Sequence, residues 1–402
     1  MLRSERKESI LKYRLIYTGL ILFVYILGRC IPLYGVDVPA YSHEAVNGEE
    51  LLMQSIGGDV YRFSIFAVGM SPFMISGILI QIVVACRDSV SKARISPGKI
   101  GRISVLLTLV IAVLQAFVKM LRMKFIIEGE ALPAARIIVI AEMVTGAMLI
   151  MWLAERNTRF GIGGRTMLIV INILEGIIST VRGYEMKSLT SPLAVSMLVM
   201  LIVLIMENAE KRIPVQRISI HNIYADKNYM AIKLNPVGVM PVMFSTALFI
   251  LPQLLAVLLS YLFPGHPGIL WWRENLSLMK GPGIAVYIFC LCLLTVFFSM
   301  VLVSPKDITE RFLKNGDSLV SIHAGKDTKK YLRGVMWRIS LFSAGVMSVC
   351  VGIPFILQMK GNIDGAITML PASIMLLTGL WCNIFREITA IRNCDSYHPI
   401  FK

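Results

Sequence analysis

The sequence contains ten apolar stretches with few or no charged residues, each close to the length that a helix needs to cross a bilayer, about 17 to 25 residues. Charged residues make up only 16% of the chain, whereas ordinary soluble domains carry about a quarter. The sequence therefore predicts an all-α polytopic membrane protein with ten transmembrane helices. The approximate limits of the stretches are 15–33, 63–85, 103–120, 137–154, 162–178, 191–206, 237–263, 283–303, 339–359 and 366–384.

The formal net charge of +15 is distributed unevenly between the two sides of this topology. Of the 40 basic residues, 29 fall in 1–14, 86–102, 154–165, 207–233, 304–338 and 386–402. These segments are the termini and every second loop, so they lie on one side. Because Lys and Arg accumulate in cytoplasmic loops, we expect both termini to be cytoplasmic. The first stretch is longer than the apolar core of a signal peptide, and we expect it to stay in the membrane.

The sequence shows no common catalytic or metal-binding pattern. The seven cysteines show no C-x-x-C spacing, the five histidines are scattered, and neither H-E-x-x-H nor G-x-S-x-G occurs. Ionisable residues inside the spans include Arg29, Glu142 and Glu175. We expect Arg29 to reach the outer surface along its flexible stem and the two glutamates to face other helices or a watery interior. No catalytic residue, metal site or cofactor is predicted.

An internal repeat divides the chain into two halves. Residues 68–76 read V-G-M-S-P-F-M-I-S, and residues 237–245 read V-G-V-M-P-V-M-F-S. The copies lie in the second and the seventh span, so each half holds five spans. Because five is odd, the halves have opposite orientations, as in inverted-topology repeats. We predict an N-terminal half at 1–190 and a C-terminal half at 191–402.

The repeat also predicts where the two halves meet. A proline removes a backbone donor from a helix, and such interruptions persist in a membrane only where protein or water satisfies the freed groups. The two copies are therefore expected to face each other across a seam. Met70, Met74 and Met243 lie at the repeat, and methionine suits surfaces that accept varied apolar partners. The alternative is two independent proline kinks.

Several short motifs resemble the SecY/Sec61-alpha family of protein-translocation channels, and they occur in the family's order over most of the chain. The motifs are G-R-C-I-P at 28–32, G-V-D at 35–37, G-G-D at 57–59, S-I-F-A-V-G-M-S-P at 64–72, R-F-G-I-G-G at 159–164, N-P-V-G-V-M-P at 235–241, S-P-K-D-I at 304–308 and G-K-D-T-K-K-Y-L at 325–332.

This resemblance implies a role for particular positions. A plug that seals the resting pore would span about 51–62 and include Ser55, Ile56, Gly57, Gly58 and Asp59. The pore ring would be Met70, Met74, Thr166, Val170, Met243 and Leu376. Polar points along a lateral gate would be Ser76, Gln81, Ser245 and Thr246. A docking surface for a motor or ribosome would include Lys211, Arg212, Arg217, Lys326, Lys329, Lys330 and Arg333.

The resemblance further implies the central channel subunit of a protein translocase in the bacterial cytoplasmic membrane. Such a channel passes unfolded secretory polypeptides, recognises signal peptides and releases apolar segments into lipid; it is not an enzyme. Implied partners are small SecE/SecG-like subunits and a SecA-type motor ATPase or the ribosome, docked on loops 207–233 and 304–338. The alternative for these basic loops is that they only fix topology and bind anionic lipid.

Some positions depart from the family's usual pattern. His323-Ala324 stands where an Arg-Pro pair is usual, and the connectors are short. Together with R-I-P-V-Q-R at 212–217 and His221-Asn222, these features resemble the accessory SecY paralogues that serve specialised surface proteins with a second motor ATPase. A secondary transporter with a 5+5 inverted repeat is the alternative function, and a membrane-bound enzyme ranks third.

Overall fold

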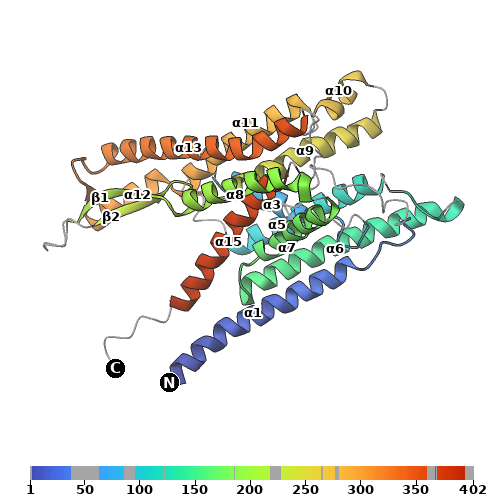
Figure 1. Ribbon diagram of the computed structural model, residues 1–402, viewed down its shortest axis with the longest axis horizontal. Helices are drawn as coiled ribbons and strands as arrows, with labels where there is room; N and C mark the ends of the chain where they lie inside the picture. Colours follow the sequence, from blue (N-terminus) through green and yellow to red (C-terminus); the bar gives the residue numbers. More distant parts are fainter. Residues whose placement is uncertain are drawn as a thin grey trace.

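The computed structural model describes residues 2–37, 63–85, 96–121, 123–127, 129–184, 186–217, 228–263, 266–276, 280–359, 367 and 369–393. The chain forms an elongated bundle of long helices that run side by side (Figure 1). The helices of the N-terminal half are α1 (Leu2–Arg29), α3 (Ser71–Ala85), α5 (Pro97–Met120), α6 (Leu132–Phe160) and α7 (Thr166–Gly183), with a 3-10 turn, η2 (Gly129–Ala131), before α6.

The C-terminal half repeats this series with additions. Its helices are α8 (Met186–Asn208), α9 (Met240–Leu262), α10 (Pro267–Asn275), α11 (Gly281–Leu302), α12 (Pro305–Asn315), α13 (Lys326–Met359) and α15 (Leu370–Asn393). Its strands are β1 (Glu210–Arg217), β2 (Tyr229–Lys233) and β3 (Asp317–Leu319). The helix α8 begins before the predicted division at 190/191, which remains a prediction.

Each of the ten predicted stretches coincides with a helix. In the described part of the chain, nine helices are long and apolar enough to cross a membrane, and Ser71–Val84 within α3 is a shorter apolar helix. At 15 residues, α3 rises about 22 Å, less than the ~30 Å of a hydrocarbon core. The predicted polytopic helical fold is confirmed, with one span that is only partly helical.

The ends of the bundle agree with an even number of crossings. Figure 1 places the beginning of α1, the end of α15, the strands β1 and β2, and α12 toward one end of the molecule. The short helix α10 lies at the opposite end. Helices of the two halves meet where α3 and α5 pack against α9, and where α7 and α1 pack against α15.

A small antiparallel sheet outside the bundle was not predicted. Its strand order is β2-β1-β3, with Ile213 opposite Met230 and Val215 opposite Leu319. The inward side chains of the sheet pack against the first turns of α13, where Leu332 and Met336 are buried. The alternating apolar residues Ile213 and Val215 are the period-2 signal of these strands. The sheet therefore holds the basic strand β1 beside the first turns of α13.

Candidate functional site

The two copies of the repeat have the same backbone conformation. Gly69 has φ +65° and Gly238 has φ +67°, a region that residues with a side chain rarely adopt. The helices α3 and α9 begin at Ser71 and Met240, just after these glycines. Each repeat proline therefore stands in the first helical turn, where its missing N–H is not needed. The expectation that these prolines interrupt a continuous helix was wrong: the repeat starts the helix.

The segment 63–70 before α3 is non-helical and mostly buried. Such backbone is stable at membrane depth only if its polar groups are satisfied by protein. The Leu33 amide donates to the Phe63 carbonyl at 2.9 Å, and the Ile65 amide donates to the Ile31 carbonyl at 3.1 Å. The Lys119 ammonium donates to the Ala67 carbonyl, and the Ser71 hydroxyl donates to the Val68 carbonyl.

Close packing of glycines makes room for this segment. A Cβ on Gly146 of α6 would lie 2.1 Å from the Ile65 carbonyl oxygen, and one on Gly28 of α1 would lie 2.2 Å from the Phe66 ring. The segment is thus wedged between α1 and α6. On the other side of the seam, a Cβ on Gly379 of α15 would lie 2.3 Å from Val239, in the turn that precedes α9.

The predicted pore-ring positions come from four helices or their first turns, two helices in each half. Five of the six, Met70, Met74, Val170, Met243 and Leu376, belong to the main buried apolar cluster, which runs through helices of both halves. Their exposed fractions lie between 1% and 6%. In this structure the five side chains are packed together with the core, and almost none of their surface is open to water.

Thr166 differs from the other five ring positions. It is half-buried and begins α7, where its hydroxyl donates to the Gly163 carbonyl. It therefore helps to start α7 and does not belong to the apolar cluster. Its neighbour Met167 packs against the edge of that cluster.

The predicted gate residues bond within their own halves. The Ser76 hydroxyl on α3 lies 2.7 Å from the Thr108 hydroxyl on α5. The Thr246 hydroxyl on α9 lies 3.1 Å from the Tyr287 hydroxyl on α11. The Ser245 hydroxyl donates to the Val242 carbonyl of its own helix, and Gln81 is exposed. Phe73 of α3 and Phe244 of α9 belong to the same buried apolar cluster.

The remaining predicted sites are the plug and the docking surface. The plug positions 55–59 lie outside the described residues. The docking positions Lys211, Arg212 and Arg217 lie on β1, where the Arg212 guanidinium sits 4.7 Å from the centre of the Tyr229 ring. Lys326, Lys329, Lys330 and Arg333 lie on the first turns of α13. Lys329 and Arg333 line one cavity, whereas Lys330 lines another.

The ionisable residues inside the spans are paired with protein groups. Arg29 is only 4% exposed, forms an ion pair with Glu175 of α7 and lies over the Tyr25 ring. The expectation that Arg29 reaches the outer surface was wrong, because a carboxylate inside the bundle holds it. Glu142 accepts the Tyr34 backbone amide at 3.0 Å.

Sequence reasoning missed a second ion pair and a polar node. Glu207 of α8 is 2% exposed and accepts from Arg386 of α15 at 3.1 Å and from Asn235 at 3.3 Å. In the other half, Asn157 accepts from Thr18 and donates to the Ile162 and Gly164 carbonyls. Asn157 lies just before the R-F-G-I-G-G motif and binds two of its carbonyls, whereas Glu207 stands at the first position of the predicted loop 207–233.

Comparison with known proteins places these features in a family. The family model described as SecY matches residues 64–385. Accessory Sec system protein translocase subunit SecY2 of Streptococcus agalactiae is 27% identical, over 98% of this chain and 97% of that relative. The protein of the same description from Leuconostoc gelidum subsp. gasicomitatum is 27% identical over 96% of both chains. That from Streptococcus salivarius is 28% identical over 98% of both.

Solved structures share the fold. One described as a protein conducting channel has a TM-score of 0.70 at 19% identity, over 97% of this chain and 94% of that one. Sec61 in the canine ribosome-channel complex has a TM-score of 0.65 at 18% identity with the same coverage. The fold and the paired repeat define a polytopic helical membrane protein built from two oppositely oriented halves. The chain belongs to the SecY family.

Proposed function

We propose that this chain is the channel-forming subunit of a protein translocase, and that polypeptides cross between its halves at the collar formed by Met70, Met74, Val170, Met243 and Leu376. The observation that carries the proposal is that both copies of the inverted repeat contribute buried apolar side chains to one cluster shared by the two halves, and that the helices they begin, α3 and α9, are in contact. The family and the SecY2 relatives support the same function.

The chemistry of the collar suits an extended polypeptide. A narrow apolar constriction resists the passage of ions because water leaves it readily. Methionine side chains adapt their shape, so the collar can close around chains of varied sequence. Separation of α3 from α9 would expose a segment in the channel to lipid, where a sufficiently apolar stretch partitions. No step requires a catalytic group in this chain, so energy must come from a partner.

The finer assignments belong to the same proposal. The SecY2 relatives support the accessory type of translocase, as does the His323-Ala324 pair. We assign the chain to a bacterial cytoplasmic membrane with its termini, sheet and α12 in the cytoplasm, since basic residues concentrate there. Partners would be SecE/SecG-like subunits and a SecA-type motor or a ribosome, docked on β1 and the first turns of α13.

A crosslinking experiment tests the channel. Cysteine is placed at Met74 or Met243 in a variant without native cysteines, and a secretory chain carrying a crosslinker is stalled during translocation. Both positions are expected to crosslink to the stalled chain. The matched control is cysteine at Phe289, which lies on α11 with 69% of its surface exposed. Crosslinking no stronger at Met74 and Met243 than at Phe289, together with uptake of a small solute, would favour the transporter alternative.

A further inference from the structure

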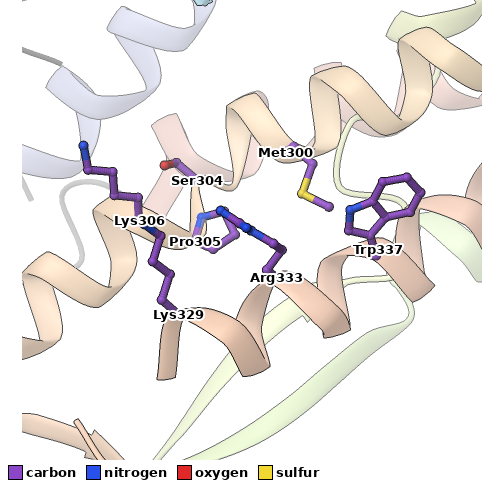
Figure 2. Close-up of a pocket in the computed structure, with 7 residues that line it drawn as sticks. All are labelled: Met300, Ser304, Pro305, Lys306, Lys329, Arg333 and Trp337. Atoms are coloured by element: carbon purple, nitrogen blue, oxygen red, sulfur yellow. The ribbon is translucent and has the colours of Figure 1, made fainter. Parts of the chain in front are cut away.

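A cavity of about 410 Å³ opens between the end of α11, the start of α12 and the first turns of α13. Its described lining consists of Met300, Ser304, Pro305, Lys306, Lys329, Arg333 and Trp337. This volume falls within the ~300–1,000 Å³ of typical small-molecule sites. Figure 2 shows Lys329 and Arg333 extending from α13 toward Ser304 and Pro305, with Met300 and Trp337 at the other end of the cavity.

The polar end of this cavity is suited to an anion. Three of its described lining residues are cationic, and none is acidic. Within the described part of the chain, Lys306, Lys329 and Arg333 have no ion pair or side-chain hydrogen bond. The nearby carboxylates of Asp307 and Glu310 belong to exposed residues of α12. Guanidinium and ammonium groups without internal partners are suited to a phosphate, which accepts several charge-assisted hydrogen bonds.

The apolar end of the cavity indicates that the phosphate belongs to a lipid. Lys329, Arg333, Trp337 and Leu341 follow one another at four-residue spacing, so they share one face of α13. Trp337 is 48% exposed and Leu341 is 53% exposed. Trp337 directly precedes the stretch 339–359 that is predicted to enter the bilayer, and tryptophan is enriched at such interfaces. This face therefore runs from a cationic group at headgroup depth to an apolar surface beside the acyl chains.

We infer that this cavity binds the phosphodiester headgroup of an anionic phospholipid from the cytoplasmic leaflet, with Lys329 and Arg333 on the phosphate and Trp337 and Met300 against the glycerol and upper acyl chain. A basic pocket between helices on the cytoplasmic side is a recognised mode of lipid-headgroup binding. The inference goes beyond the proposed translocation function and needs only the membrane topology.

A neighbouring cavity supplies a matched control. On another face of α13, a cavity of about 400 Å³ is lined by Ile322, Asp327, Lys330, Tyr331, Gly334, Val335 and Arg338. Its described lining also has two cations on α13, but it includes the carboxylate of Asp327 and no tryptophan. Lys330→Gln/Arg338→Gln and Lys329→Gln/Arg333→Gln therefore remove the same charge from the same helix, and only the second pair changes the proposed site.

The test reads lipid at Trp337 itself. The full-length protein is reconstituted in phosphatidylcholine vesicles that contain a minor fraction of one brominated lipid, either phosphatidylglycerol or phosphatidylcholine. The brominated acyl chains quench the fluorescence of nearby tryptophan. The Trp337 signal is the difference from Trp337→Phe. We expect stronger quenching by brominated phosphatidylglycerol. The preference of the site for phosphatidylglycerol over phosphatidylcholine should fall about 25-fold in Lys329→Gln/Arg333→Gln, which is about fivefold for each cation. It should stay unchanged in Lys330→Gln/Arg338→Gln.

Three results would overturn the inference. They are equal losses in both double variants, a preference kept in Lys329→Gln/Arg333→Gln, and displacement of the lipid by inorganic phosphate at constant ionic strength, which would identify a site for soluble phosphate. Arg333→Lys guards against a folding artefact, because it keeps the charge and should keep most of the preference. The assay requires no translocation, so its failure is independent of any failure of the channel proposal.

Discussion

Arg29, the last residue of α1, forms an ion pair with Glu175 of α7. The second half has the same connection with the charges exchanged: Glu207, near the end of α8, pairs with Arg386 of α15 at 3.1 Å. In each half the pair joins the first long helix to the last. The ion pairs therefore hold each half together internally and do not cross the junction between them.

Exchanging the charges of one pair tests this internal connection. Arg29→Glu should lower stability by about 1–3 kcal/mol, because two carboxylates then meet where one side chain is buried and the other, Glu175, is 34% exposed and partly screened by solvent. Arg29→Glu/Glu175→Arg should recover a substantial part of that loss. The measurement is the thermal unfolding midpoint of the detergent-solubilised protein. A double variant no more stable than Arg29→Glu would show that the pair does not connect α1 to α7.

The wedge of segment 63–70 between helices predicts a contrast between two glycines. Gly146→Ala should lower the free energy of unfolding by about 1–3 kcal/mol, because the new methyl group would overlap the Ile65 carbonyl. Gly19→Ala on α1 is the control, since a Cβ there meets nothing within 4 Å. It should be neutral or stabilise the helix by up to about 1 kcal/mol. Equal effects in denaturant unfolding would contradict the close packing at Gly146.

The proposed collar predicts an ion leak when its side chains are removed. Met70→Gly/Met74→Gly/Met243→Gly should raise the conductance of the reconstituted protein, because a wider and less apolar constriction stays wet. The matched control replaces the exposed methionines Met197, Met240 and Met359 with glycine. Conductance that stays at the wild-type level in the collar variant, or rises equally in the control, would argue against the collar.

The hydrogen bonds of the gate residues predict a separation of stability from opening. Thr108→Val removes the partner of Ser76 within the N-terminal half and should lower the free energy of unfolding by about 1 kcal/mol. It should leave signal-peptide-induced separation of α3 and α9 unchanged, measured by spin-label distances across the seam. A shift of that distance distribution would show that the Ser76–Thr108 bond restrains the seam.

The sequence allowed the fold to be predicted because span length, charge bias and the repeat are local signals. The ten stretches, and the equivalence of residues 68–76 and 237–245, could be read directly. The ion-pair partners of Arg29 and Glu207 could not, because each lies more than a hundred residues away in the chain. The directions of Ser76 and Thr246 were also inaccessible, since a serine or threonine on a helix can face any neighbour. The sheet could not be predicted either, because β1 offers only Ile213 and Val215 as an alternating apolar signal within a strand dominated by charged residues.

The helix α13 has 34 residues and rises about 51 Å, whereas the hydrocarbon core spans about 30 Å. Roughly 20 Å of it therefore projects beyond the bilayer as a rigid stalk, braced on one side by the buried side chains of the sheet. A load applied to β1 is passed to this stalk through packed side chains, and from there to α11, which lies alongside it. A partner that tilted the stalk would therefore move the membrane part of the C-terminal half without entering the bilayer.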